Sequence, residues 1–153
     1  MMMKKRIVVK IGGSTLASPE TLSKLAELVR GYQRRQYQVI VVHGGGPAVN
    51  AELTARGITW KFINGQRQTT PEMIDFIEDV LARKVNGALV GQLRDFSLNA
   101  VSMSGAQNLL FCSQASEELM QVGNVEFVSS ETLESLLAGP GRVVPVIAPI
   151  GVG

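Results

Sequence analysis

Short apolar runs alternate with longer amphipathic segments in the first third of the chain. Residues 6–11 and 38–42 are two runs rich in Val and Ile, and each run stops at a glycine loop. Apolar spacing after the loops predicts one helix opened by Ser18 and Pro19 and a second from Pro47 to about Gly57, because Ser caps a helix and Pro fits its first turn. Strand, loop and helix thus occur twice, which is typical of a parallel sheet with right-handed crossovers.

The next segment predicts a hairpin followed by a long helix. Residues 60–63 and 66–69 flank the dipeptide Asn-Gly at 64–65, a strong hairpin signal between strand-forming residues. Thr70, Pro71 and Glu72 then open a helix that we expect to reach about Val90. Its apolar positions form one stripe (Ile74, Ile77, Leu81, Val85, Ala88, Leu89) that a second set widens (Met73, Phe76, Val80, Val90). Two interpretations remain open for this helix, a central core helix and a subunit interface.

The second half of the chain predicts further strands and one more helix. Two short strands are expected within residues 100–112, around Ser104 and Gly105. Residues 125–128 are either another strand or the approach to a helix at Glu131–Leu137, and residues 142–148 form a last buried strand. The complete pattern predicts an α/β fold, a three-layer α/β/α sandwich with a mainly parallel central sheet.

Composition narrows the class of protein without identifying it. The 153 residues are 45% apolar and 18% charged, with a formal net charge of +2. The apolar and charged fractions fit one globular domain. The net charge is too small to indicate the clustered basic face that nucleic-acid binding requires. No run of 18 apolar residues predicts a membrane span. The single cysteine, Cys112, cannot form an internal disulfide and is expected to be a buried thiol, so we expect a cytoplasmic protein.

Two glycine loops carry the strongest chemical signal. Gly12 and Gly13 follow the first predicted strand, and residues 44–46 are all glycine after the second. Ligands of open α/β sheets bind outside the carboxyl ends of the strands, where glycine lets backbone N–H groups approach an anion. Either loop alone is more simply a tight turn, but two in equivalent positions favour an anion site. Lys10, inside the first apolar run, is either a strand-end lysine that reaches solvent or a fixed positive charge at that site.

At this point the residues resemble a known family. The segments that carry the resemblance are residues 9–13 (Val-Lys-Ile-Gly-Gly), 42–47 (Val-His-Gly-Gly-Gly-Pro) with Asn50, 64–67 (Asn-Gly-Gln-Arg), 70–73 (Thr-Pro-Glu-Met) and 145–153. Together they are similar to the amino-acid kinase family, and within it to the acetylglutamate kinases. The resemblance covers the whole chain but only about the first half of a family member.

The resemblance implies an activity and roles for particular residues. It implies transfer of the γ-phosphoryl group of ATP to the γ-carboxylate of N-acetyl-L-glutamate, in arginine biosynthesis. Lys10 is the implied catalytic residue and stabilises the transferring group. The implied substrate- and phosphate-binding residues are the loop glycines, whose N–H groups hold oxygens, and Arg67, which binds the α-carboxylate (Gly12, Gly13, Gly44, Gly45, Gly46, Arg67). No metal ligand is expected, and His43, the only histidine, is interpreted as a structural neighbour of the glycine loop.

The same resemblance sets limits on the chain. Residues 1–153 correspond to a single amino-acid-substrate-binding lobe, and the nucleotide-binding half of the family would lie beyond Gly153. We therefore expect ATP and Mg²⁺ as cofactors of a complete enzyme, neither binding this chain normally. Either the protein is truncated at this point, or its remainder is not included in this chain. Residues 104–109 (Ser-Gly-Ala-Gln-Asn-Leu) also depart from a Ser-Gly-x-Asp-Gly-Gly-like stretch usual in the family.

Other functions and partners stay open at this point. A related kinase that acts on a longer acetylated amino acid such as aminoadipate, or on a carrier-bound one, would share these motifs. A non-catalytic domain that binds an amino acid or only assembles with partners is the alternative from another class. We expect a small acetylated amino acid as ligand, no nucleic acid and no membrane, and a homodimer formed through the helix near residues 71–90.

Overall fold

The protein is built around a four-stranded parallel sheet. The computed structural model describes residues 4–16 and 18–153. The strand order is β1-β2-β8-β5, so the two strands that end in glycine loops are neighbours. The strands of this sheet are Lys5–Ile11 (β1), Tyr37–His43 (β2), Ala100–Ser104 (β5) and Val144–Ala148 (β8). Strands β2 and β8 are separated by about a hundred residues in sequence, so their pairing is decided by tertiary packing.

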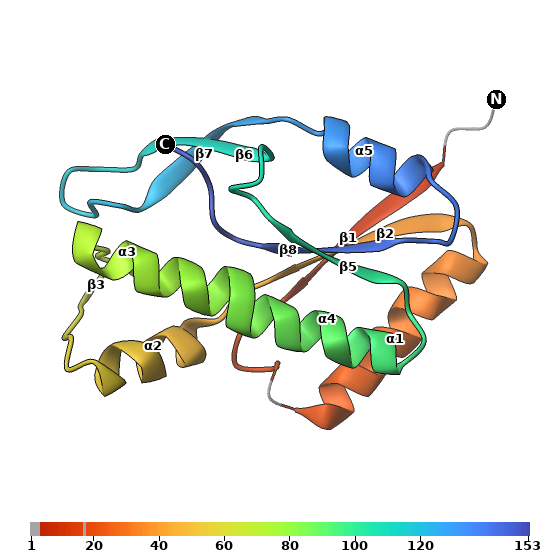
Figure 1. Cartoon of the computed structure of the whole chain (residues 1–153), viewed down its shortest axis with the longest axis horizontal. Coiled ribbons are helices and arrows are strands. Elements are labelled where there is room, and N and C mark those ends of the chain that lie inside the picture. Colours follow the sequence, from red (N-terminus) through yellow and green to blue (C-terminus); the bar gives the residue numbers. More distant parts are fainter. Residues whose placement is uncertain (1–3, 17) are drawn as a thin grey trace.

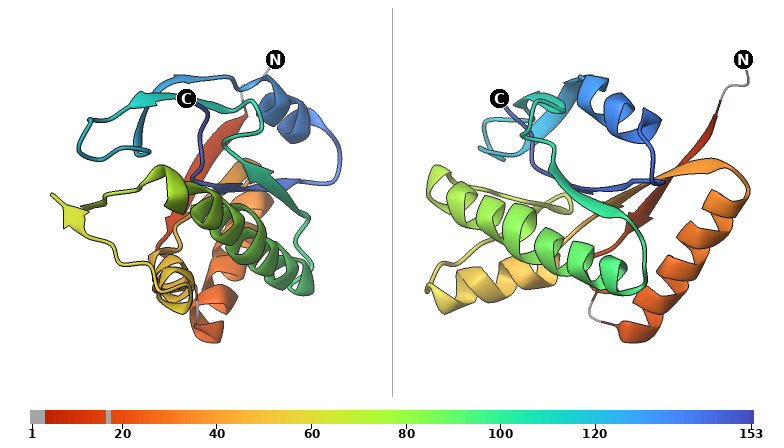
Figure 2. Two further views of the ribbon diagram at one scale, coloured as in Figure 1. Left: turned by 60° about the vertical axis from the view of Figure 1, so that its left-hand side comes forward. Right: turned by 45° about the vertical axis from the view of Figure 1, so that its right-hand side comes forward.

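Helices cover both faces of the sheet, which confirms the predicted three-layer architecture (Figures 1 and 2). On one face lie α1, α2 and a long helical segment, with bounds Pro19–Arg34 (α1), Gly46–Ala55 (α2), Pro71–Glu78 (α3), Asp79–Val85 (η1) and Asn86–Asp95 (α4). On the other face lie Glu131–Ala138 (α5) and a hairpin formed by Leu110–Gln114 (β6) and Gly123–Val128 (β7). Residues 125–128 are therefore strand, which settles one of the open alternatives.

Local signals in the sequence explain where the helices begin. The Ser18 hydroxyl accepts a hydrogen bond from the Thr21 N–H at 3.3 Å, and the Thr70 hydroxyl accepts one from the Met73 N–H at the same distance. A proline follows each cap in the first turn. Both caps satisfy N–H groups that have no partner inside the helix, as the sequence predicted.

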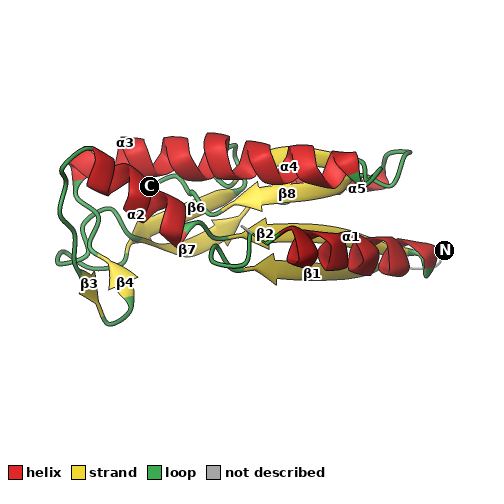
Figure 3. Cartoon of the chain, turned by 90° about the horizontal axis from the view of Figure 1, so that it is seen from below, coloured by secondary structure: helices red, strands yellow, loops and turns green. Residues whose placement is uncertain are grey.

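The predicted hairpin is present but its strands are shorter than expected. Strand β3 is Phe62–Ile63 and β4 is Gln66–Arg67, joined by Asn64 and Gly65. Both joining residues have positive φ, 50° and 80°, as a two-residue hairpin turn of the favoured type requires. The hairpin projects beyond the sheet at the end where α2 also lies (Figure 3).

The long helix runs past its predicted end near Val90 and reaches Asp95. Its central segment η1 has π-helical hydrogen bonding over seven residues, and the backbone continues into α4 without a break. A π-helical turn shifts the faces of the helix relative to a regular α-helix and is often found at functional sites. The sequence pattern gave no indication of it.

Two members of the second apolar set of this helix, Met73 and Val80, lie in the core of the chain, which favours the core-helix interpretation at these positions. Met73 is 5% exposed and Val80 is 2% exposed, both packed in a cluster with Val49 and Leu53 of α2. The Arg56 guanidinium stacks over the Phe76 ring, with 3.9 Å between the guanidinium carbon and the ring centroid. Sequence spacing alone did not reveal that α2 packs on this face of the helix.

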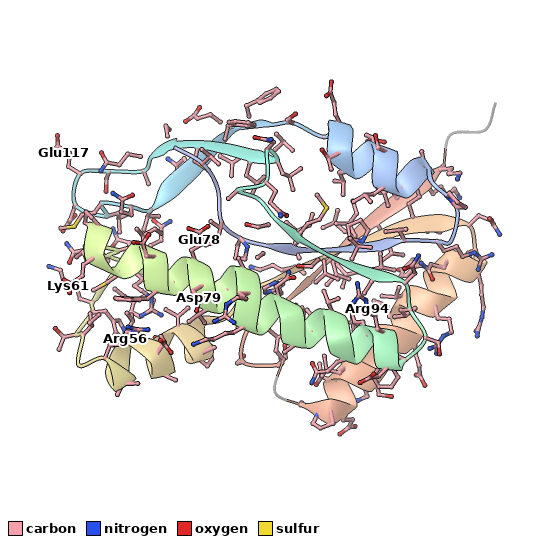
Figure 4. All side chains as sticks on the ribbon, viewed as in Figure 1. Arg56, Lys61, Glu78, Asp79, Arg94 and Glu117 are labelled. Atoms are coloured by element: carbon pink, nitrogen blue, oxygen red, sulfur yellow. The ribbon has the colours of Figure 1, made fainter. Side chains whose placement is uncertain are left out.

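Charged side chains tie α2 to the long helix at its surface. Lys84 lies 3.3 Å from a Glu52 oxygen and 3.8 Å from an Asp79 oxygen, and Glu52 also accepts from Arg56 at 2.8 Å. Figure 4 labels Arg56, directly after the end of α2, and Asp79 on the long helix. Each exposed ion pair of this kind contributes little to stability. Together they link α2, which follows the second glycine loop, to the long helix.

In the described part of the chain, no helix is both long enough and apolar enough to span a membrane. The thiol of Cys112 is partly exposed rather than buried as expected, because β6 lies at the surface of the small hairpin sheet.

Candidate functional site

The two glycine loops meet at the carboxyl edge of the sheet. Strands β1 and β2 are parallel and in register, with Ile11 opposite His43. Beyond that pair, the Gly44 N–H donates to the Ile11 carbonyl at 3.0 Å. The first turn of α2 begins directly after the second loop, at Gly46. The loops are thus side by side, as an anion site shared between them requires.

The loop backbones approach too closely for any side chain between them. A Cβ atom on residue 13 would lie 2.7 Å from the Gly45 nitrogen, inside the contact distance of two heavy atoms. A Cβ on residue 45 would collide with the Leu81 side chain of η1, with Val85 next to it at 3.4 Å. Packing therefore requires glycine at position 13, where the contact is with backbone, whereas at position 45 the Leu81 side chain would have to move. Gly12 and Gly46 have open space around them and carry no such requirement.

Lys10 lies on β1, one residue before the edge, with its side chain exposed. Ile7, Val9 and Ile11 pack into the core on the face of α1 and α4, so the alternation of a strand places Lys10 on the opposite face. Arg6, on the same face, pairs with Glu134 of α5 at 2.6 Å. Val8 between them is 57% exposed, so this face of β1 is open toward its carboxyl end. Among the described residues no ion pair involves Lys10.

His43 lies under the second loop in a buried polar network. The Asn86 side-chain nitrogen lies 3.0 Å from His43 Nε2 and donates to it, because an amide nitrogen cannot accept. His43 Nδ1 then carries the proton and donates to the Gly44 carbonyl at 2.9 Å. Burial lowers the pKa of His43 below its ordinary value, and the hydrogen bond to the Gly44 carbonyl opposes this only in part. The ring is therefore neutral near pH 7, and the interpretation of His43 as a neighbour of the loop is confirmed.

Arg67 at the end of β4 has an incomplete set of partners. Its Nη2 donates to the Asn50 side-chain oxygen at 2.6 Å, which ties the hairpin to α2. The guanidinium carbon lies 5.3 Å from the Trp60 ring centroid and 4.9 Å from that of Phe62. The remaining terminal nitrogen, Nη1, is buried with no hydrogen-bond partner in the described part of the chain. Burial lowers the pKa of Arg67, but a guanidinium remains charged at every physiological pH.

The structure thus brings the glycines and Lys10 to one edge of the sheet. Arg67 lies on the hairpin and is tied to α2 through Asn50. Sequence reasoning missed the aromatic rings beside Arg67 and the buried Asn86. An asparagine in an otherwise apolar stretch of helix was the available signal for Asn86. No signal in the sequence indicated the role of the aromatic residues, because their contact with Arg67 depends on how the Asn64-Gly65 turn folds the hairpin.

Cavities lie on both sides of this edge. One of about 570 Å³ lies between α3 and the β6–β7 hairpin and includes Thr69, two residues after Arg67. Another of about 340 Å³ lies beside Gly13 and Gly45 and is walled by Val85, Ala88 and Leu89. In residues 4–16 and 18–153, no group of three or more His, Cys, Asp or Glu side chains is placed to hold a metal ion.

Comparison with known proteins gives a family assignment over nearly the whole chain. The model of the amino acid kinase family matches residues 5–153. The acetylglutamate kinase of Geobacillus stearothermophilus is 36% identical over 152 residues, which cover 98% of this chain and 57% of that protein. The chain spans about half the length of the curated relatives it matches, from 51% to 57% among three of them.

Solved structures agree on the fold. The smu.665 protein of Streptococcus mutans superposes with a TM-score of 0.81 at 25% identity, over 97% of this chain and 60% of that one. The N-acetylglutamate synthase of Neisseria gonorrhoeae, solved with coenzyme A and N-acetyl-glutamate, gives a TM-score of 0.73 at 22% identity. That match covers 97% of this chain and 34% of the synthase, and at this identity it shows the fold alone.

Proposed function

Because this chain belongs to the amino acid kinase family, we propose that it is the amino-acid-binding lobe of an N-acetyl-L-glutamate kinase of arginine biosynthesis. The complete enzyme would transfer the γ-phosphoryl group of ATP to the γ-carboxylate of N-acetyl-L-glutamate. The curated relatives named acetylglutamate kinase support the substrate class. Within the family, the chemistry of the site supports a carboxylate substrate.

The observation that carries the proposal is the unsatisfied guanidinium of Arg67. A buried N–H group without a partner costs about 1–3 kcal/mol, and more when the group is charged. The guanidinium lies over the Trp60 and Phe62 rings, and Asn50 accepts from one of its terminal nitrogens. The free Nη1 can donate to a carboxylate oxygen, the anion whose geometry a guanidinium matches best. We assign this group to the α-carboxylate of the amino acid.

The reaction would need charge neutralisation rather than a general base. A γ-carboxylate with a pKa of about 4.3 is already ionised at neutral pH. One of its oxygens would attack the γ-phosphorus of ATP, the bond from that phosphorus to the bridging oxygen would break, and ADP would leave with the bond electrons. Lys10 and the glycine-loop N–H groups would stabilise the negative charge on the transferring group.

We assign no binding site for Mg²⁺ or for the bulk of ATP to this lobe. Its described residues offer no cluster of carboxylates that fits Mg²⁺, so we assign the ion no ligand here. ATP would be bound mainly by residues outside this chain. The roles proposed for this lobe are binding the amino acid, orienting its γ-carboxylate and supplying positive charge beside it.

Calorimetric titration of the chain with N-acetyl-L-glutamate tests the proposal. We expect measurable binding by the wild type, and we expect Arg67→Ala to weaken it by about 2–5 kcal/mol, the range for a buried charged partner. Arg35→Ala is the matched control, because Arg35 follows α1 at the opposite end of the sheet and stacks on Tyr32. Equal affinity of wild type and Arg67→Ala would rule out the assigned site. Tighter binding of N-acetyl-L-aminoadipate would reassign the substrate.

A further inference from the structure

The peptide group between Gly44 and Gly45 is held from the side away from Lys10. The Gly44 carbonyl accepts from His43 Nδ1 at 2.9 Å. In a planar trans peptide the C=O and the following N–H point in opposite directions. The Gly45 N–H therefore points away from His43, on whose side of the sheet the long helix lies.

The ring that holds this peptide is itself held by the long helix. Asn86, which is 0% exposed, donates to His43 Nε2 at 3.0 Å and to the Val146 carbonyl of β8 at 3.0 Å. The Ser102 hydroxyl of β5 donates to the Asn86 side-chain oxygen. The amide is thus oriented from two strands, and its nitrogen can only donate to the ring. This arrangement selects the imidazole tautomer with its proton on Nδ1.

The same stretch of helix supports the loop by packing. Leu81 and Val85 of the π-helical segment lie against Gly45, and Asn86 follows directly after that segment. Placing these three contacts together depends on the local helix geometry, because residues 81, 85 and 86 must all face the loop and the strand beside it. Packing and hydrogen bonding from one helix thus converge on a single peptide group.

We propose that His43 and Asn86 are positioning residues that aim the Gly45 N–H at the anion bound by the glycine loops. The inference rests on the proposed function in taking these loops as the anion site. Neither side chain touches the ligand in this scheme: Asn86 sets the tautomer of His43, and His43 sets the direction of the Gly44–Gly45 peptide. An N–H fixed before the ligand arrives needs no reorganisation when negative charge develops beside it.

Nitrogen NMR of the labelled full chain tests the first half of the inference without a variant. We expect His43, the only histidine, to carry its proton on Nδ1 and to be unprotonated on Nε2 at pH 7. A ring protonated on Nε2 alone, or on both nitrogens, would overturn the proposal. Asn86→Asp replaces the amide donor by a carboxylate that can only accept, so this variant is expected to draw a proton onto Nε2.

Inorganic phosphate titrated against the Gly45 amide signal tests the second half. His43→Asn keeps a side-chain donor near the Nδ1 position, whereas His43→Gln moves it toward the Nε2 position. We expect phosphate to shift the Gly45 signal in the wild type, with an affinity within about threefold in His43→Asn and at least tenfold weaker in His43→Gln. Equal affinities in the two folded variants, or no response of Gly45 in the wild type, would overturn the inference.

These outcomes separate the two proposals. Absence of N-acetyl-L-glutamate binding, together with the expected phosphate contrast, would reject the proposed substrate and keep the positioning role. Binding of N-acetyl-L-glutamate that depends on Arg67, with no phosphate contrast, would keep the proposed function and reject the positioning role.

Discussion

Gly13 and Gly45 are in backbone contact across the two loops, and a Cβ at position 13 would lie 2.7 Å from the Gly45 nitrogen. The nitrogen in that contact is the one whose N–H is proposed to bind the anion. A single methyl group at position 13 would therefore displace the proposed binding group as well as the loop. This relationship gives the first prediction.

Gly13→Ala is expected to weaken phosphate and N-acetyl-L-glutamate binding by at least tenfold, because backbone cannot yield as a flexible side chain can. Gly12→Ala is the matched control, since a Cβ there meets nothing within 4 Å. Titration calorimetry on both variants checks the contrast. Equal losses in the two would show that the contact between the loops is unimportant for binding.

Lys10→Ala, introduced into a complete enzyme, is expected to lower kcat by about 10²–10³-fold, the range for loss of one group that stabilises transition-state charge. Amino-acid affinity should change much less, because the charge that Lys10 meets develops during transfer. Steady-state kinetics with a separate measurement of the dissociation constant checks this. Lys24→Ala, in an exposed pair with Glu20, is the control. A near-normal kcat would remove Lys10 from its role.

Unfolding stability is expected to fall as pH is lowered through about 6.5, because of His43. Its pKa is lowered in the folded protein by burial, so below the unfolded pKa of about 6.5 the unfolded chain binds the proton first. The stability that neutral His43 contributes is complete above that pH and decreases below it. Urea unfolding from pH 5 to 8 measures the slope. His43→Asn should flatten it in this window, and an unchanged slope would contradict the assignment.

Self-association through the long helix stays a prediction, with a narrower surface than the sequence suggested. Met73 and Val80 are covered by α2, so the apolar face left at the surface lies around Ala88, beside the cavity walled by Val85 and Leu89. Small exposed residues there, Gly87, Ala88 and Gly91, allow a second helix to approach closely.

Sedimentation of the purified chain at tens of micromolar should therefore show a dimer, and Ala88→Glu should shift it to monomer. Phe76→Glu should have a smaller effect, because Arg56 already covers that ring. Leu28→Glu, at an exposed apolar position of α1, controls for added charge. A wild-type monomer at that concentration would exclude this interface.

The sequence by itself determined where the main helices begin and where the short hairpin turns, because the signals for these features are local. Caps at Ser18 and Thr70, and the Asn64-Gly65 turn, act through groups within four residues of each other. The alternation of strand and helix then fixed a parallel sheet, and with it the meeting of the two glycine loops at one edge.

Tertiary structure alone decided the contacts between distant segments. The β2–β8 pairing joins residues about a hundred positions apart, and Asn86 reaches His43 across 43 positions. The burial of Met73 and Val80 by α2, and the aromatic support of Arg67, likewise depend on how finished elements pack. Periodicity records which face of an element is apolar, but the partner of that face, and of any buried polar group on it, is chosen only when the whole chain folds.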